Sequence, residues 1–180
     1  MLVARELTNP GKMLDYESSL QKAIDLFPTD PTVAVEVDYY EGARISKEDL
    51  DAARADPSTF NKPVATHKNI DVEGAGARYE MKRVAPLIHD EGKLVDQVKE
   101  GVAKFTDAKI QALGHGGTKR NIVDVRYDDK IRIQGATESS IRARIERYVQ
   151  QNRRMVGFVD EIAIHAEIDS KDVDIVVEVK

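Results

Sequence analysis

The sequence predicts an α+β fold in which an antiparallel sheet built from hairpins is flanked by three or four helices. Two segments in the last third alternate apolar and polar residues on both sides of a short turn, which is typical of β-hairpins. Elsewhere, apolar residues recur every three or four positions, which is typical of amphipathic helices. At 180 residues, the chain is expected to form a single domain over residues 1–180.

The first third of the chain predicts an arm, a helix, a strand and a short second helix. Residues 1–12 end in turn residues and are expected to form an N-terminal arm. An amphipathic helix is predicted from Met13 to Phe27, because its apolar residues keep a helical spacing until a proline stops it. Residues 33–40 alternate as a half-buried strand does. A short helix is then predicted from Lys47 up to Pro57.

The middle of the chain predicts a long loop and then a helix. Residues 57–79 are expected to form an extended loop or arm, because prolines and glycines interrupt them and their apolar residues show no sustained period. Pairing of part of this stretch as an edge strand is the alternative. A helix is expected from about Pro86, with a break at Gly92. The glycine-rich turn at residues 114–117 ends it.

Two hairpins are predicted in the last third. Residues 123–127 face residues 131–133 if the three residues between them form the hairpin loop. The final hairpin pairs residues 156–168 with residues 173–179, and a four-residue turn at 169–172 brings both apolar sets to one face.

A helix with an arginine-rich side is predicted between these hairpins, from Glu138 to Arg154, with Thr137 as its N-cap. Three arginines fall on one side of it and form the predicted basic face: Arg144, Arg147 and Arg154. Such a face can bind the phosphates of nucleic acid, pair with acidic groups of another subunit, or simply remain solvated.

An acidic face is predicted on the outward side of the final hairpin, and its residues are Glu167, Asp174 and Glu178. The four-residue turn would set Glu167 opposite Asp174, and like charges in such a pair are unfavourable. A basic surface on a neighbouring subunit would relieve the repulsion between these like charges. The alternative is that the charged residues only protect an edge strand from aggregation.

Charge is unevenly distributed along the chain. Residues 1–60 carry a net charge of -6 and residues 155–180 carry -5, whereas residues 61–154 carry +6. The acidic ends of the chain can neutralise its basic middle, either within one folded chain or between subunits that pack head to tail.

One segment resembles the K homology RNA-binding module. Gly114–Gly117 fits the glycine loop of that module, and Lys130–Gly135 with Ile141 and Ile145 is similar to its following strand and helix. The resemblance implies RNA binding, although the module has a helix directly after its loop and residues 118–121 leave little room for one.

Enzyme signatures are sparse. The sequence has no cysteine and no complete dinucleotide-binding or Walker motif, and its four histidines are scattered. Asp169, Glu178 and Lys180 resemble the acidic and lysine constellation of metal-dependent nucleases, but strand alternation also explains Glu178 and Lys180 as outward residues. We therefore expect no catalytic residue, cofactor or metal, and an enzyme with an unrecognised site remains an alternative.

The function expected from these patterns is that of a structural or assembly subunit of a larger protein complex. Its expected partners are copies of itself or neighbouring subunits, and nucleic acid is a second candidate partner. By analogy of form, a virion component of a tailed phage or a part of a contractile injection device fits this description. No signal peptide or membrane segment is apparent, so a cytoplasmic or virion location is expected.

Overall fold

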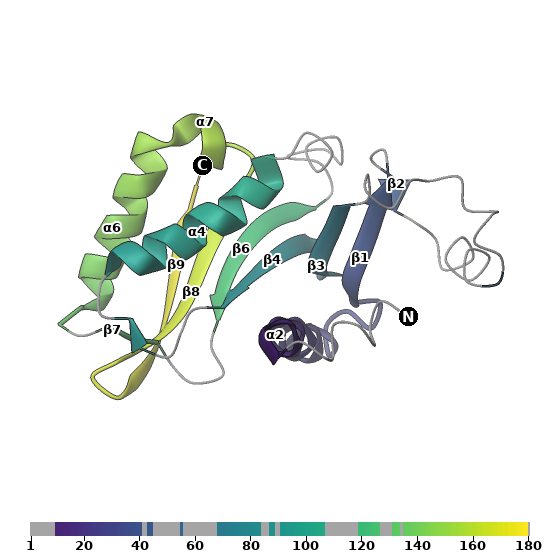
Figure 1. Ribbon diagram of the computed structural model, residues 1–180, viewed down its shortest axis with the longest axis horizontal. Helices are drawn as coiled ribbons and strands as arrows, with labels where there is room; N and C mark the ends of the chain where they lie inside the picture. Colours follow the sequence, from purple (N-terminus) through teal and green to yellow (C-terminus); the bar gives the residue numbers. More distant parts are fainter. Residues whose placement is uncertain are drawn as a thin grey trace.

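The computed structural model describes residues 10–40, 43–44, 55, 68–83, 87–88, 91–106, 119–126, 131–133 and 135–179. These residues form an α+β fold, in which helices cover both faces of one mixed sheet (Figure 1). The helices are α2 (Pro10–Leu26), α4 (Glu91–Thr106), α6 (Glu138–Gln151) and α7 (Arg153–Val156). The strands are β1 (Ala34–Tyr40), β2 (Ala43–Arg44), β3 (Lys68–Gly74), β4 (Ala77–Arg83), β5 (Leu87–Ile88), β6 (Arg120–Arg126), β7 (Ile131–Ile133), β8 (Glu161–Ile168) and β9 (Lys171–Glu178).

The six longer strands lie side by side in the order in which they follow along the chain: β1, β3, β4, β6, β8 and β9. The pairs β1/β3, β3/β4 and β8/β9 are antiparallel, whereas β4/β6 and β6/β8 are parallel. Short β2 pairs with β1. Strand β7 pairs with β8 beyond the end of β6, and β5 pairs with β7. Thus β5 and β7 extend β4 and β6 by one short segment each.

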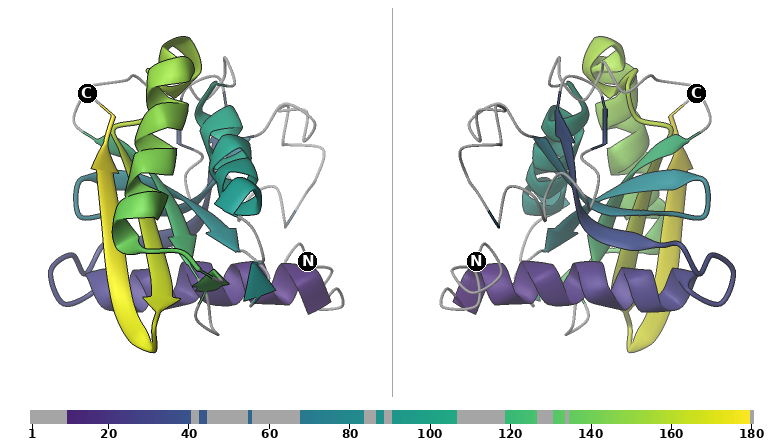
Figure 2. Two further views of the ribbon diagram at one scale, coloured as in Figure 1. Left: turned by 90° about the vertical axis from the view of Figure 1, so that its left-hand side faces the viewer. Right: turned by 90° about the vertical axis from the view of Figure 1, so that its right-hand side faces the viewer.

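Helices α4 and α6 lie on one face of the sheet and α2 lies on the other (Figures 1 and 2). Each parallel pair is joined through a helix on the first face: α4 leads from β5 to β6, and α6 with α7 leads from β7 to β8. Such connections are required, because parallel strands cannot be joined by a tight turn.

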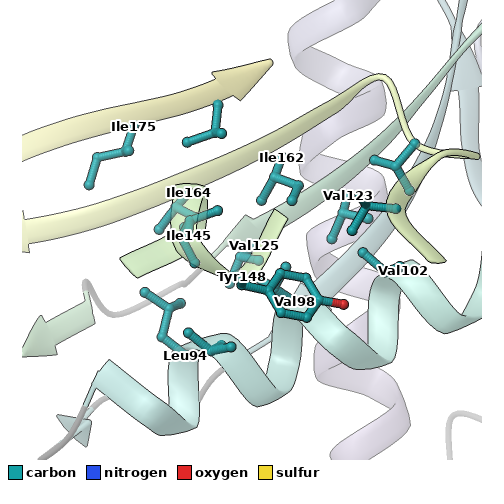
Figure 3. Close-up of a cluster of buried hydrophobic side chains, with 14 of the residues drawn as sticks. Leu94, Val98, Val102, Val123, Val125, Ile145, Tyr148, Ile162, Ile164 and Ile175 are labelled. Atoms are coloured by element: carbon teal, nitrogen blue, oxygen red, sulfur yellow. The ribbon is translucent and has the colours of Figure 1, made fainter. Parts of the chain in front are cut away.

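The largest apolar cluster fills the space between the sheet and helices α4 and α6 (Figure 3). Val98 and Val102 of α4 and Ile145 of α6 are fully buried against Val123 and Ile162 of the central strands. Gly101 permits this approach, because a Cβ atom there would stand 2.5 Å from Cγ1 of Val123. The helices are therefore held on the sheet by close packing of β-branched side chains.

The predicted hairpin between residues 123–127 and 131–133 is wrong. Strands β6 and β7 do not pair with each other; both pair in parallel with β8. They occupy successive stretches of one edge of β8, and β9 occupies the other edge. A pairing with a strand far along the chain has replaced the local one, and this makes the sheet mixed rather than antiparallel.

The loop predicted over residues 57–79 is wrong from Lys68 onward. Strands β3 and β4 form a hairpin whose two-residue turn, Ala75–Gly76, has positive φ angles of 50° and 74°. Residues 57–67 lie outside the described part of the chain. The helix expected from Pro86 begins instead at Glu91, because Leu87 and Ile88 belong to β5.

The final hairpin is confirmed over β8 and β9, with a shorter first strand and a shorter turn than predicted. Val156, predicted in the first strand, belongs to α7, and β8 begins only at Glu161. Ile168 pairs with Lys171, so only Asp169 and Ser170 form the turn, and both have positive φ angles. The register differs from the prediction by two residues, so Ile162, Ile164, Ile175 and Val177 still face the core. Asp174 consequently lies opposite His165 instead of Glu167.

The first and fourth predicted helices are confirmed in outline. Helix α2 begins at Pro10, inside the predicted arm, of which residues 1–9 are not described. Thr137 caps α6: its hydroxyl accepts a hydrogen bond from the Ser140 amide, and the Ser140 hydroxyl accepts one from the Thr137 amide. The helix ends at Gln151, so Arg154 belongs to the separate short helix α7. Of the helix predicted from Lys47, only Ala55 is described, and it is helical; the glycine loop at 114–117 falls outside the described residues.

Candidate interaction surface

Helix α2 lies on the sheet through small side chains. Ser18 and Ser19 are buried, and Ala23 and Leu26 pack against an apolar cluster of the sheet that includes Tyr79. Helix α2 contacts strands β1, β3 and β4 of the sheet. The side of α2 that faces the sheet is therefore not the most apolar side of this helix.

The most apolar described side of α2 is exposed. Leu20, Ile24 and Phe27 follow each other at spacings of four and three residues, and their exposed fractions are 38%, 64% and 59%. We call these three residues the α2 stripe. These residues belong to the apolar spacing that predicts an amphipathic helix, and such a row usually faces a core, but the structure places it in solvent. Large apolar side chains grouped on a surface mark sites of association with other molecules.

Polar contacts fix α2 in this orientation. Lys22 donates a hydrogen bond of 2.7 Å from Nζ to the Asp124 carboxylate of β6, and its ammonium group lies 4.2 Å from the centre of the Tyr79 ring. Asp25 accepts a hydrogen bond of 2.6 Å from the Arg126 guanidinium. These interactions orient the charged side of α2 towards the sheet, and the α2 stripe is left on the outside.

Asp124 is the centre of this charged cluster. Its side chain has no exposed surface, and it contacts Lys22 at 2.7 Å, Arg126 at 3.0 Å and His165 Nε2 at 3.2 Å. Burial alone would raise the pKa of the carboxyl group, but His165, Lys22 and Arg126 outweigh burial and lower the pKa to about 2. Asp124 is thus a permanent anion at neutral pH, which suits a structural anchor better than a general base.

His165 lies between two carboxylates. Its Nδ1 is 2.7 Å from Asp174 of β9, and its Nε2 faces Asp124. Burial lowers the pKa of the imidazole, but the two carboxylates outweigh it and raise the pKa above 6.5. Both ring nitrogens are therefore directed at anions, which favours the charged imidazolium.

The predicted basic face is exposed but is not one continuous stripe. Arg144 and Arg147 lie on α6, whereas Arg154 lies on α7 beyond the helix break at Asn152. Among the described residues, no ion-pair partner is found for these three arginines or for Arg153. Arg142 differs, because it donates a hydrogen bond of 2.7 Å to the Val176 carbonyl of the edge strand β9.

The predicted acidic residues are placed in different surroundings. Asp174 is bound to His165, and Glu178 lies directly opposite Glu161. Arg120 bridges that like-charged pair, with contacts of 3.0 Å to Glu161 and 2.9 Å to Glu178. The like-charged pair that predicted a basic partner, Glu167 with Asp174, is absent, because Asp174 lies opposite His165. Glu167 lies opposite Asp172 near the hairpin turn.

A surface pocket of about 460 Å³ lies between α6, α7 and the end of β9. Its apolar lining consists of Val149, Val156, Val177 and Val179. Its polar rim includes Glu146, Gln150, Arg153 and Glu178. We call it the α6–β9 pocket. An apolar floor with a few polar groups at the rim is the usual composition of a binding pocket.

Sequence reasoning missed the contacts that define this surface. Lys22 and Asp124 are separated by 102 positions, and nothing local to either residue indicates that they meet. By contrast, the alternation along β6 does indicate that Asp124 lies on the opposite face of the strand from Val123 and Val125. Within the described ranges, no group of three His, Cys, Asp or Glu side chains is arranged to hold a metal ion.

Comparison of the chain with protein family models, with curated proteins and with solved structures found no significant match. In the part of the chain that the structure describes, no helix is long and apolar enough to cross a membrane.

Proposed function

We propose that this protein is a structural subunit of a larger protein assembly and that it contacts a neighbouring subunit through the α2 stripe. The observation that supports this function is the exposure of Leu20, Ile24 and Phe27 on a helix whose opposite side is fixed to the sheet by ion pairs. Such a row in solvent is unfavourable for an isolated protein, and burial in a contact removes that cost. By analogy of form, we propose the tail, neck or baseplate of a tailed phage or an injection device as its setting.

Light scattering coupled to size-exclusion chromatography tests this function. We expect wild-type protein to form a defined oligomer above its chain mass of 20.1 kDa. An apolar contact should persist in high salt, whereas a contact made by exposed charges alone should loosen. Ile24→Asp should reduce the mass to that of one chain. A wild-type monomer at every salt and protein concentration would contradict self-assembly through this helix.

A second candidate function is nucleic-acid binding, and one observation favours it: Arg144, Arg147, Arg153 and Arg154 are exposed without ion-pair partners among the described residues. Fluorescence anisotropy with a labelled oligonucleotide should then show affinity that falls steeply as salt rises. Arg144→Glu should weaken binding and lower the salt slope by about 1. Lys93→Glu, at an exposed position of α4, is the matched control. Equal weakening by both variants would indicate non-specific attraction.

A further inference from the structure

In the part of the chain that the structure describes, an exposed apolar row and an apolar recess are found on different elements. The α2 stripe presents Ile24 and Phe27 with more than half of their surface exposed. The α6–β9 pocket has a floor of valine side chains. Figures 1 and 2 place α2 at one end of the molecule, and α7 with the end of β9 at the other. One chain therefore cannot fill its own pocket with its own stripe.

We infer that the α2 stripe of one copy of this protein docks into the α6–β9 pocket of a second copy. This inference rests on the proposed function and specifies its partner. An apolar protrusion that fits a pocket elsewhere on the same molecule gives a head-to-tail contact, which closes into a ring or continues as a filament.

Charge at the two ends favours this pairing. Glu17 is exposed and lies three positions before Leu20, so it borders the α2 stripe on the same side of the helix. Asp25 follows Ile24 directly and remains partly exposed beside Arg126. At the other end, Arg153 is on the pocket rim and Arg154 is next to it. Acidic groups beside the protrusion thus meet basic groups beside the recess.

A symmetric contact between two α2 stripes is disfavoured by the same charges. Glu17 and Asp25 of one copy would approach the acidic residues of the other, and like charges across a contact reduce its affinity. Glu146 and Glu178 also belong to the pocket rim, but Glu178 is paired with Arg120 of its own chain, which also contacts Glu161. Arg153 and Arg154 therefore dominate the unpaired charge near the pocket in the described residues.

Sheet extension through the edge strand β9 is disfavoured too. Arg142 donates a hydrogen bond to the carbonyl oxygen of Val176 in β9, and the exposed side chains of Asp174 and Glu178 in the same strand are charged. Capped carbonyls and charges of one sign keep edge strands from pairing with each other. The docking of a helix into a pocket is the contact that these features leave available.

The test uses one blocked variant for each surface. Ile24→Asp places a charge in the α2 stripe, and its control Ala103→Asp adds the same charge at an exposed position of α4. Gln150→Trp fills the pocket from its rim, and its control Gln151→Trp adds the same bulk at the next exposed position, away from the pocket. Circular dichroism spectra of all four variants should match the wild type, because each position is exposed. Association raises the apparent unfolding temperature, so thermal unfolding is compared between the two blocked variants and between the two controls, and each pair should agree.

Masses are then measured by sedimentation velocity for each variant and for an equimolar mixture of Ile24→Asp and Gln150→Trp. We expect each blocked variant alone to be a monomer, both controls to oligomerise, and the mixture to form a dimer and nothing larger. The dimer is expected because the mixture contains one intact stripe and one intact pocket per pair.

Other results overturn the inference in distinguishable ways. If Ile24→Asp is monomeric but Gln150→Trp still oligomerises, the stripe meets a surface other than the pocket; head-to-tail docking is then wrong, and the proposed function stands. If wild-type protein is monomeric at all concentrations, both the docking and self-assembly through α2 are wrong.

Discussion

A carboxylate without any exposed surface is costly to desolvate, and Asp124 is stable in the fold because Lys22, Arg126 and His165 surround it. Its lowered pKa links this environment to stability. Because the folded-state pKa is about 2 and the usual value is 3.8, ionised Asp124 stabilises the fold above pH 3.8. That contribution is of order 2 kcal/mol and is lost as the pH falls through the folded-state pKa.

Asp124→Asn should lower the free energy of unfolding by about 2–4 kcal/mol, because Lys22 and Arg126 lose the anion between them. Urea unfolding at neutral pH measures this change. Asp96→Asn is the control, because Asp96 pairs with Lys99 on an exposed surface of α4 and its loss should change stability by less than about 0.5 kcal/mol. A comparable loss in both variants would show that burial of the Asp124 cluster contributes nothing.

His165 should make stability depend on pH in the opposite direction. Its folded-state pKa is raised above 6.5 by Asp124 and Asp174, with Arg126 acting against them. The charged imidazolium therefore stabilises the fold fully below pH 6.5, and this stabilisation is lost as the pH rises through the raised pKa. Urea unfolding between pH 6 and pH 9 should show the decline in wild type, and His165→Gln should flatten it. An unchanged profile in the variant would assign the decline to another group.

At the scale of elements, Gly101 shows how a helix is fitted to the sheet. Glycine inside a helix is ordinarily less stable than alanine by about 0.5–1 kcal/mol. Gly101→Ala should nevertheless destabilise this protein by roughly 1–3 kcal/mol, because the added methyl group would overlap Val123. Thermal unfolding measures the change. Val123→Ala in the same background should recover part of the loss, and a stabilising Gly101→Ala would mean that α4 can move away from the sheet.

Periodicity predicted the helix at α2 correctly, but it does not indicate which side of this helix is buried. The apolar spacing of Leu20, Ile24 and Phe27 is the usual sign of a core face. The contacts of Lys22 and Asp25 with the sheet oppose that placement and leave the α2 stripe outside. Those contacts depend on Asp124 and Arg126, about a hundred positions away, and local sequence cannot reveal them.

Two strands were missed for a different reason. In β3 and β4, Ile70, Val72, Tyr79 and Met81 do alternate, so a signal was present. The alternate positions of these strands include Glu73 and Glu80. Their charge predicts exposure to solvent, but both are buried and form ion pairs with Lys119 and Lys104. Strands with buried charge on one side resemble loops in composition, and the glycines of the turn strengthen that impression.

Across the whole molecule, the two faces of the sheet are stabilised by different interactions. Helices α4 and α6 are held by a large apolar cluster, whereas α2 is held by small side chains and the Asp124 cluster. Local stability follows such differences, because segments with fewer buried apolar contacts open at a lower free energy. The side that carries the α2 stripe is therefore expected to open first.

Hydrogen exchange measured by mass spectrometry tests this order. Amides of α2 should exchange faster than those of α6 in wild type, and Asp124→Asn should accelerate exchange in α2 more than in α6. The reason is that the substitution removes contacts that attach only α2. Equal acceleration in both helices would instead show that they open together as a single cooperative unit.

The turn between β8 and β9 has a consequence for how this protein can change in evolution. Its two residues could be replaced by four without moving any side chain of the hairpin to the other face, because the faces alternate with a period of two. A single inserted residue would instead direct Asp172, Asp174 and Glu178 at the core and expose Ile175 and Val177. Related sequences should therefore differ in the length of this turn by even numbers, and odd differences should be accompanied by a β-bulge that restores the pattern.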